Sequence, residues 1–250
     1  MQPSPVQTQT TVMNGLSNCE FLGLYAQAGR IGLSGGVTLI DKAICRAERH
    51  LDERDLCGAW SHAFLFQGQR LDGHHWVIES DLQVHRKHIQ FGVQENRISK
   101  YYDEALYTSL AVLDLGLTEA QVACLLREGL ELVANRARYS LRELFGTLIA
   151  LHRPELRARG NLLARESSLY CSALLQHLFR KAGLDLAPGV DLKNTTPEDI
   201  ARTPVPHVAY LLQRDAERSK LADLKTRLRR KVSARLRRLK RRRIIRARSQ

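Results

Sequence analysis

The sequence has 250 residues, 44% of them hydrophobic, and a formal net charge of +13. This is enough apolar material for one domain with a sizeable core, and no stretch approaches the roughly 20 apolar residues that a membrane-spanning helix needs. The positive charge is local, because residues 214–248 hold 17 of the 39 Lys and Arg residues but only 3 of the 26 acidic ones, which leaves the rest of the chain nearly neutral.

The N-terminal segment MQPSPVQTQTTVMNG is polar and carries no basic residue. It does not match a secretory signal, and we predict that residues 1–20 are disordered. The five cysteines are odd in number and scattered, and no two of them have C-x-x-C spacing. We therefore expect free thiols in a reducing, cytoplasmic setting, and neither a zinc knuckle nor a redox pair.

The first regular elements are expected after a glycine-rich stretch. A helix is predicted near residues 37–51. Aromatic residues alternate in WSHAFLF, a turn rich in Gly, Gln and Asp follows, and an extended apolar run resumes in WVIES, so residues 60–80 are predicted to form two antiparallel strands. A third short strand is expected at residues 88–93.

The middle and the end of the chain favour helices. Capping boxes at residues 118–121 and 140–143 each precede an apolar run, and the second run stops at Pro154. A helix is expected over residues 168–182, with basic residues in its last turn and a glycine after it. Thr196 is the predicted N-cap of a further helix. The predicted fold class is α+β, a small, mostly antiparallel sheet with helices packed around it.

Cys171 lies on the apolar stripe of the helix predicted at 168–182, since Leu174, Leu175 and Leu178 follow it at helical spacing. With Ser168 as N-cap, it is the third residue of the first turn, where the helix dipole and unpaired N–H groups favour a thiolate. Cysteine is also a small hydrophobic residue that packs well in a core. A neighbouring base would distinguish a nucleophile from a packing residue.

His62 is the candidate base, and Glu79 is the candidate partner of its ring. Strand alternation places His62 among aromatic residues on one face, where it could simply be a satisfied core residue. A loop centred on Arg70 and Leu71 would set His62 opposite Glu79, whereas a tight Asp72-Gly73 turn would set it opposite Gln83. A buried carboxylate needs a partner, and orienting an imidazole would provide one.

Four segments in order carry a resemblance to a known family: WSHAFLF, WVIES, YCSALLQHLFRKAGLDL and TTPEDIA. Their succession resembles the circularly permuted, YiiX- and YebB-like branch of the NlpC-type, papain-fold cysteine hydrolases. The resemblance covers roughly residues 21–210. The chain departs from the family at Ala173, where an acid is common, and in the segment GLYAQAGRIGLSGG.

The resemblance implies a permuted papain-like domain at residues 21–212, with a helical insertion at about 101–160. It makes Cys171 the nucleophile, His62 the base and Glu79 the orienting residue of a Cys-His-Glu triad. Tyr139 and Tyr170 are expected to bind substrate near the cleft. The implied reaction is attack of a thiolate on an amide, ester or thioester carbonyl, through an acyl-enzyme, by an amidase, peptidase, esterase or acyltransferase without a cofactor.

No metal site is expected. His74 and His75 fall in a predicted turn, and His85 and His88 lie beside basic residues, without acidic or thiol ligands at suitable spacing. We expect these four histidines to be exposed loop residues.

The C-terminal segment from residue 213 to 250 predicts a basic amphipathic helix, because leucine and valine recur every three or four residues among the arginines and lysines. An anionic membrane surface is the favoured partner of residues 214–250, which would make the protein peripheral at the membrane. Nucleic-acid phosphates are a second candidate, although the segment lacks the aromatic residues on which bases stack. Packing of the leucine stripe on the domain is the third.

Two functions from different classes therefore remain after the sequence is read. The first is a thiol-dependent hydrolase or acyltransferase acting on a peptide-like or lipid-like acyl substrate. The alternative is a catalytically inert binding module that keeps the fold and delivers its basic tail to a membrane or nucleic acid. The two differ in whether Cys171 and His62 meet in the folded chain, 109 residues apart in sequence.

Overall fold

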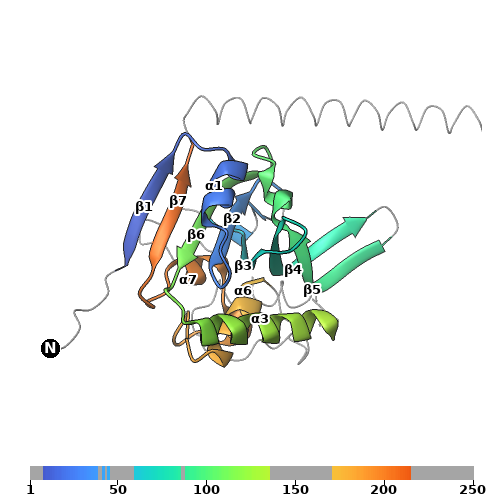
Figure 1. The fold of residues 1–250 in the computed structure, drawn as a ribbon, viewed down its shortest axis with the longest axis vertical. Coiled ribbons are helices and arrows are strands. Elements are labelled where there is room, and N and C mark those ends of the chain that lie inside the picture. The colour runs from blue at the N-terminus through green and yellow to red at the C-terminus, as the bar shows by residue number, and fades with distance from the viewer. Residues whose placement is uncertain are drawn as a thin grey trace, which may run out of the picture.

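The structure of the protein is a computed structural model, and it describes residues 8–38, 41–42, 44–45, 59–85, 88–135 and 171–214. Within these residues, seven strands form one sheet in the order β1-β7-β6-β2-β3-β4-β5 (Figure 1). The strands are β1 (Gln9–Asn14), β2 (Ile31–Gly36), β3 (His62–Gln69), β4 (His75–His85), β5 (His88–Arg97), β6 (Tyr107–Asp114) and β7 (Val208–Gln213). β1 and β7 are parallel, and all the other neighbours are antiparallel.

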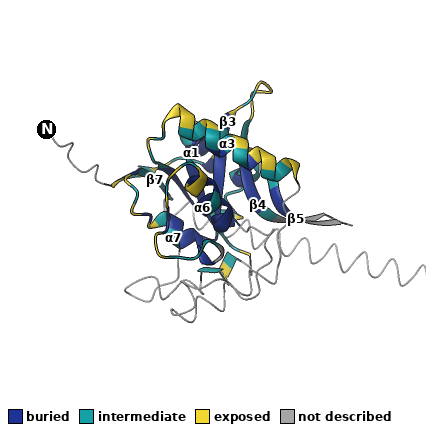
Figure 2. Ribbon diagram, turned by 90° about the horizontal axis from the view of Figure 1, so that it is seen from below, coloured by how far each residue is buried: buried dark blue, intermediate teal, exposed yellow. Residues whose placement is uncertain are grey.

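The described helices are α1 (Asn18–Tyr25), α3 (Glu119–Ala134), α6 (Cys171–Lys181) and α7 (Pro197–Ala201), with 3-10 turns η2 (Ile98–Tyr102) and η3 (Leu192–Asn194). Two apolar clusters cover the two faces of the sheet. One joins β2, β3 and β4 to α3 and α6, through residues such as Leu65, Leu125 and Leu174. The other joins the opposite side of β3 and β4, together with β6 and β7, to α1 and η2, through Phe21 and Tyr101. The α+β prediction is confirmed, with buried residues concentrated in the strands and in α6 (Figure 2).

Disorder predicted for residues 1–20 is wrong for residues 9–20. β1 lies at the edge of the sheet, and its exposed face accounts for the polar composition that had indicated disorder. Ser17 then caps α1 in a reciprocal box with Glu20, whose carboxylate accepts from the Ser17 backbone N–H at 2.7 Å. The folded domain thus begins before residue 21, because β1 pairs with β7 near the other end of the domain.

The helical insertion predicted at 101–160 is also wrong at residues 107–114, whereas residues 119–134 within it form the helix α3. Residues 107–114 form β6, which lies between β7 and β2 and buries Leu110, Ala111, Val112 and Leu113 from both faces. A strand that is covered on both faces is apolar throughout, and its sequence does not alternate between apolar and polar residues. The alternation used to predict strands is therefore absent from β6. Residues 136–160 of the predicted insertion lie outside the described residues.

Several local predictions are confirmed. Thr118 caps α3 in the expected box with Gln121, and Thr196 caps α7 with Pro197 in its first turn. Strand β5 extends the predicted third strand to Arg97. The helix predicted near 37–51 and the capping box at 140–143 fall mostly or wholly outside the described residues, although residues 41–42 and 44–45 are helical.

The end of α6 also follows the prediction. Gly183 has a φ of 82°, a conformation that favours glycine, and Leu184 N–H donates to the Phe179 carbonyl at 2.9 Å. Arg180 and Lys181 occupy the last turn. The described part of the helix begins at Cys171; residues 168–170, which include the predicted N-cap Ser168, lie outside the described part of the chain.

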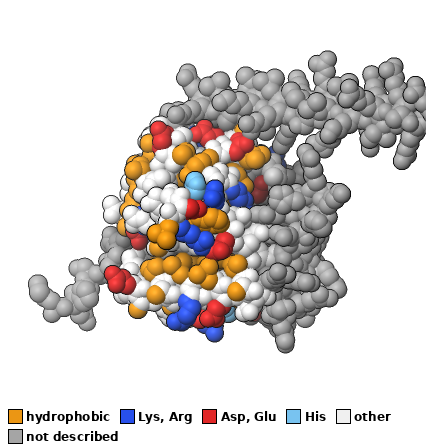
Figure 3. All heavy atoms as spheres, turned by 45° about the vertical axis from the view of Figure 1, so that its right-hand side comes forward, with side chains coloured by type: hydrophobic (Ala, Val, Ile, Leu, Met, Phe, Trp, Pro, Cys, Tyr) orange, Lys and Arg blue, Asp and Glu red, His pale blue; other side chains and the backbone are white. Residues whose placement is uncertain are grey.

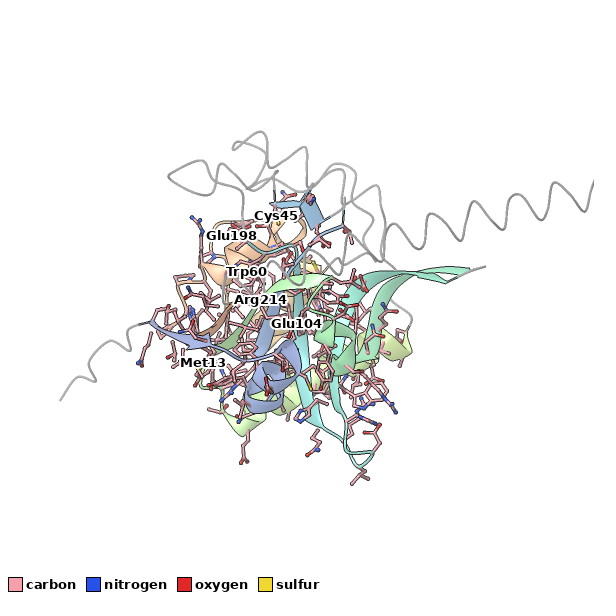
Figure 4. All side chains as sticks on the ribbon, turned by 90° about the horizontal axis from the view of Figure 1, so that it is seen from above. Met13, Cys45, Trp60, Glu104, Glu198 and Arg214 are labelled. Atoms are coloured by element: carbon pink, nitrogen blue, oxygen red, sulfur yellow. The ribbon has the colours of Figure 1, made fainter. Side chains whose placement is uncertain are left out.

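Of the basic tail predicted at residues 213–250, residue 213 is the last of β7, Arg214 follows it, and residues 215–250 are not described. The Arg214 side chain is 9% exposed, and its guanidinium donates to the Asn18 amide oxygen and to the Tyr107 carbonyl, each at 2.6 Å. Glu104 lies beside it, with its carboxylate 3.9 Å from Arg214 Nη1 (Figure 4). The tail therefore leaves the domain from a fixed point next to η2 and β6.

Candidate active site

His62 is the first residue of β3, and Glu79 lies on β4, the next strand of the sheet. Their side chains meet: Nε2 of His62 is 2.7 Å from Oε2 of Glu79. Neither predicted register is the one observed. Leu65 pairs with Ile78 and Phe66 with Val77, and the register then shifts before Gly68, which pairs with Trp76.

The shift places an extra residue in β3, a bulge next to the turn. Gly73, with a φ of 75°, donates to the Arg70 carbonyl at 2.9 Å and closes the turn. Both predicted turns are therefore wrong by a residue or two. Because side chains alternate along a strand, Glu79 still lies on the same face as His62 and next to it diagonally. Gln83, the partner in the second predicted register, has no described side chain.

Cys171 reaches His62 from the other side of the sheet. α6 packs on β3, and its first residue lies where β3 begins, so the thiol and the imidazole become neighbours there. The two side chains are close enough for each to influence the ionisation of the other, and the Ala63 backbone also influences that of the thiol. Since Nε2 of His62 faces Glu79, Nδ1 is the ring nitrogen left for the thiol.

The two groups shift each other's pKa in opposite directions. Burial alone raises the pKa of the Cys171 thiol, but the nearby His62 charge, its hydrogen bond and the Ala63 backbone lower it below the ordinary value. Burial lowers the pKa of His62, and the charge and hydrogen bond of Cys171, followed by those of Glu79, raise it to about 10. The arrangement therefore favours a thiolate paired with an imidazolium.

Glu79 has no exposed side-chain surface, yet its carboxylate is fully hydrogen-bonded. Oε2 accepts from His62 and from the Tyr101 hydroxyl, and Oε1 accepts from Asn96 Nδ2 at 2.6 Å and from Lys100 Nζ at 2.7 Å. Burial opposes ionisation, but the positive charge of Lys100 and the bonds from His62 hold the pKa of Glu79 well below its usual range. Glu79 is thus an ionised, fixed acceptor for the imidazole.

The three other partners of Glu79 were not found from the sequence. Lys100 and Tyr101 come from η2, about 20 residues after Glu79, and nothing in the local pattern links them to β4. Asn96 lies opposite Val77 on β5, so the alternation of a β4–β5 hairpin would have placed it on the face of Glu79. The ring of Tyr101 also stacks near that of His62, with centroids 6.4 Å apart.

The predicted substrate-binding residues Tyr139 and Tyr170 lie outside the described residues. His75 does not project freely, because its Nδ1 is 2.9 Å from the Ala26 carbonyl oxygen. His85 is the last residue of β4 and His88 the first of β5, so neither lies in a loop. Among the residues that the structure describes, no three His, Cys, Asp or Glu side chains are grouped as a metal ion requires. None of the described helices has the length and apolar character to cross a membrane.

Comparison with known proteins finds a structural neighbour but no match by sequence. No protein-family model and no curated protein sequence matches the chain. Among solved structures, the chain is similar to metalloprotein yiiX from Escherichia coli O157:H7, with a TM-score of 0.47 and 12% identity over 76% of this chain and 97% of that one. Similarity of this size does not define a family, so a functional assignment depends on the side-chain geometry at Cys171, His62 and Glu79.

Proposed function

We propose that the protein is a thiol-dependent hydrolase or acyltransferase in which Cys171 is the nucleophile, His62 the general base and acid, and Glu79 the residue that orients His62. One observation carries the proposal: the His62 imidazole interacts with the Cys171 thiol on one side and contacts the buried Glu79 carboxylate on the other. This is the combination that activates a nucleophile in covalent catalysis. The order of His62 before Cys171 agrees with a permuted papain-like arrangement.

The reaction that we propose begins with the Cys171 thiolate attacking an acyl carbonyl carbon. A C–S bond forms, and the carbonyl electron pair moves to oxygen, where N–H groups at the start of α6 would stabilise the charge. On collapse the bond to the leaving group breaks, and His62 gives that group its proton. His62 then takes a proton from water or another acceptor, which attacks the thioester and releases Cys171 as thiolate.

The resting charges support this sequence of steps. A His62 pKa of about 10 keeps the imidazole protonated at neutral pH, ready to act as an acid when the leaving group departs. Glu79 stays ionised and orients the ring by accepting the Nε2 proton. Amide, ester and thioester substrates all fit these steps, as do peptide-like and lipid-like acyl groups.

Iodoacetamide labelling followed residue by residue with mass spectrometry tests the proposal. At pH 6, we expect Cys171 to react about tenfold or more faster than the other four cysteines, because only a thiolate attacks the reagent. Exposure predicts the reverse order, since Cys171 is buried and Cys19 is exposed. His62→Ala should slow Cys171 alone. Equal rates at all five cysteines, unchanged in the variant, would reject a catalytic thiol.

We also propose that residues 214–250 hold this enzyme at an anionic membrane surface. The support is the amphipathic pattern of basic and leucine residues in the sequence, together with the fixed departure point at Arg214. Flotation with liposomes tests it: we expect recovery with anionic lipid and loss of recovery when residues 215–250 are deleted. Equal recovery on neutral lipid, or retention by nucleic acid alone, would contradict membrane binding.

A further inference from the structure

Lys100 lies between two carboxylates at the back of the candidate active site. Its Nζ is 2.7 Å from Oε1 of Glu79 and 2.6 Å from Oδ2 of Asp81, and its side chain is 23% exposed. Lysine is rarely buried to this extent unless it is paired. The contact is with the oxygen of Glu79 that does not face His62, so one carboxylate bridges two cations.

The number of charges around Glu79 changes in the reaction proposed above. In the resting enzyme, His62 is an imidazolium and pairs with Oε2 of Glu79. After His62 has given its proton to the leaving group, this cation is gone and the sulfur carries no charge. A carboxylate with no exposed surface would then favour return of a proton to the His62–Glu79 pair, because an uncompensated buried charge is costly. Lys100 is the cation that remains.

We propose that Lys100 is a positioning residue that keeps Glu79 ionised while His62 changes its charge. This inference rests on the proposed function, because the charge of His62 changes only if the proposed reaction takes place. The effect of the Lys100 charge on the His62–Glu79 pair can nevertheless be measured without a substrate. Lys100 is suited to this role because it contacts Glu79 directly and leaves both ring nitrogens of His62 to Glu79 and Cys171.

The charge partners of this cluster come from several elements. Asp81 of β4 is 25% exposed and shares Lys100 with Glu79. Tyr101 of η2 donates to Glu79 and Tyr107 of β6 lies near Lys100, and both stay neutral at physiological pH because burial raises their pKa, that of Tyr107 to about 12. The negative charge of Asp41 is a further, smaller contribution to the raised pKa of Tyr107. Lys100 and Asp81 therefore offer two opposite charges that can be removed without replacing either atom of the His62–Glu79 contact.

Removing the charge of Lys100 and removing the charge of Asp81 should shift the titration of His62 in opposite directions, and this difference is the test. Removing the positive charge of Lys100 should raise the pH at which the His62–Glu79 pair gives up its proton, whichever of the two groups holds it. Removing the negative charge of Asp81 should lower that pH. If Lys100 only held Glu79 in place, both substitutions would loosen the same network and would shift the titration in the same direction.

The experiment follows the His62 ring by NMR in a Cys171→Ala background, where loss of the thiolate removes the largest contribution that raises the His62 pKa. We expect the His62 midpoint to move up in Lys100→Met, to stay in place in Lys100→Arg and to move down in Asp81→Asn. An unchanged midpoint in Lys100→Met, or shifts of one sign in Lys100→Met and Asp81→Asn, would overturn the proposal.

If Lys100→Met does not fold cooperatively, Lys100→Gln keeps a donor for Glu79 Oε1 without the charge, and a wild-type midpoint in that variant would also overturn it. Failure of the proposed function is seen separately, in the alkylation rate of Cys171 in the native chain. Fast, His62-dependent alkylation of Cys171 together with an unchanged His62 midpoint would reject the role of Lys100 and leave the proposed function standing.

Discussion

The β3–β4 hairpin has a cluster of charged and aromatic residues at each end, and the two clusters differ in burial. At the turn, Asp72 pairs with Arg97 at 3.3 Å, and both Arg97 and Arg70 lie over the Trp76 ring. The Asp72 and Arg97 side chains are 38% and 50% exposed. At the other end, His62 meets Glu79, which has no exposed surface. On the molecular face drawn in Figure 3, charged side chains are spread among apolar ones.

This difference separates charges that stabilise a surface from charges that can support chemistry. At the turn, water screens the pair, and a backbone hydrogen bond from His74 contributes most to the lowered pKa of Asp72. Glu79 has no exposed surface, so each neighbouring charge acts strongly on the others. Similar residue types therefore have different consequences at the two ends of one hairpin.

The two ends of the β3–β4 hairpin should differ most in how much a substitution there lowers the free energy of unfolding. Glu79→Gln leaves Lys100 and the imidazolium without their buried carboxylate, and we expect the free energy of unfolding to fall by about 3–5 kcal/mol. Asp72→Asn, the matched change at the turn, should leave the urea midpoint close to that of the wild type. Urea denaturation of both variants measures this. Equal losses would show that burial does not separate the two clusters.

The pH dependence of stability should also differ in a defined direction. The pKa of Glu79 lies below its value of about 4.5 in the unfolded chain, so the stabilisation from its ionised form is complete above pH 4.5 and is lost as the pH falls below it. The difference in unfolding free energy between the wild type and Glu79→Gln should therefore shrink on acidification from pH 6 toward pH 3. A difference that grows on acidification would contradict an ionised Glu79.

A smaller effect is expected for one hydroxyl of the buried cluster. Tyr101→Phe removes the donor to Glu79 Oε2 but keeps the ring that packs against Phe64, with centroids 4.2 Å apart. We expect a loss of about 1–2 kcal/mol in unfolding free energy. Tyr102→Phe, next to it in η2 and partly exposed, is the control and should have less effect. Thermal and urea unfolding measure both, and an equal effect in the control would point to η2 as a whole.

The smallest expected effect concerns salt. Exposed pairs are screened once the Debye length falls to a few ångströms, at about 1 M salt. Wild type and Asp72→Asn should therefore become indistinguishable in urea unfolding at high NaCl, whereas wild type and Glu79→Gln should remain apart. Convergence of the second pair would mean that Glu79 is accessible to the solvent.

Local sequence signals predicted much of the site and its surroundings. The caps of α3 and α7 and the end of α6 depend on neighbouring residues, and they agree with the structure. The face shared by His62 and Glu79 followed from strand alternation, which holds even though both predicted registers were wrong. Four strands were missed, β7 among them. The edge strand β1 is polar, the glycine-rich β2 resembles a loop, and β6, which is buried on both faces, lacks a period of two.

The sequence by itself determined the α+β class, the thiol at the start of a helix, the imidazole at the start of a strand and a carboxylate on the next strand. Tertiary structure decided that these three side chains meet, and that Lys100, Tyr101 and Asn96 surround the carboxylate. The reason is physical: caps and alternation arise within a few residues, whereas the meeting of α6, β3 and η2 depends on how the apolar faces of distant segments pack on one sheet.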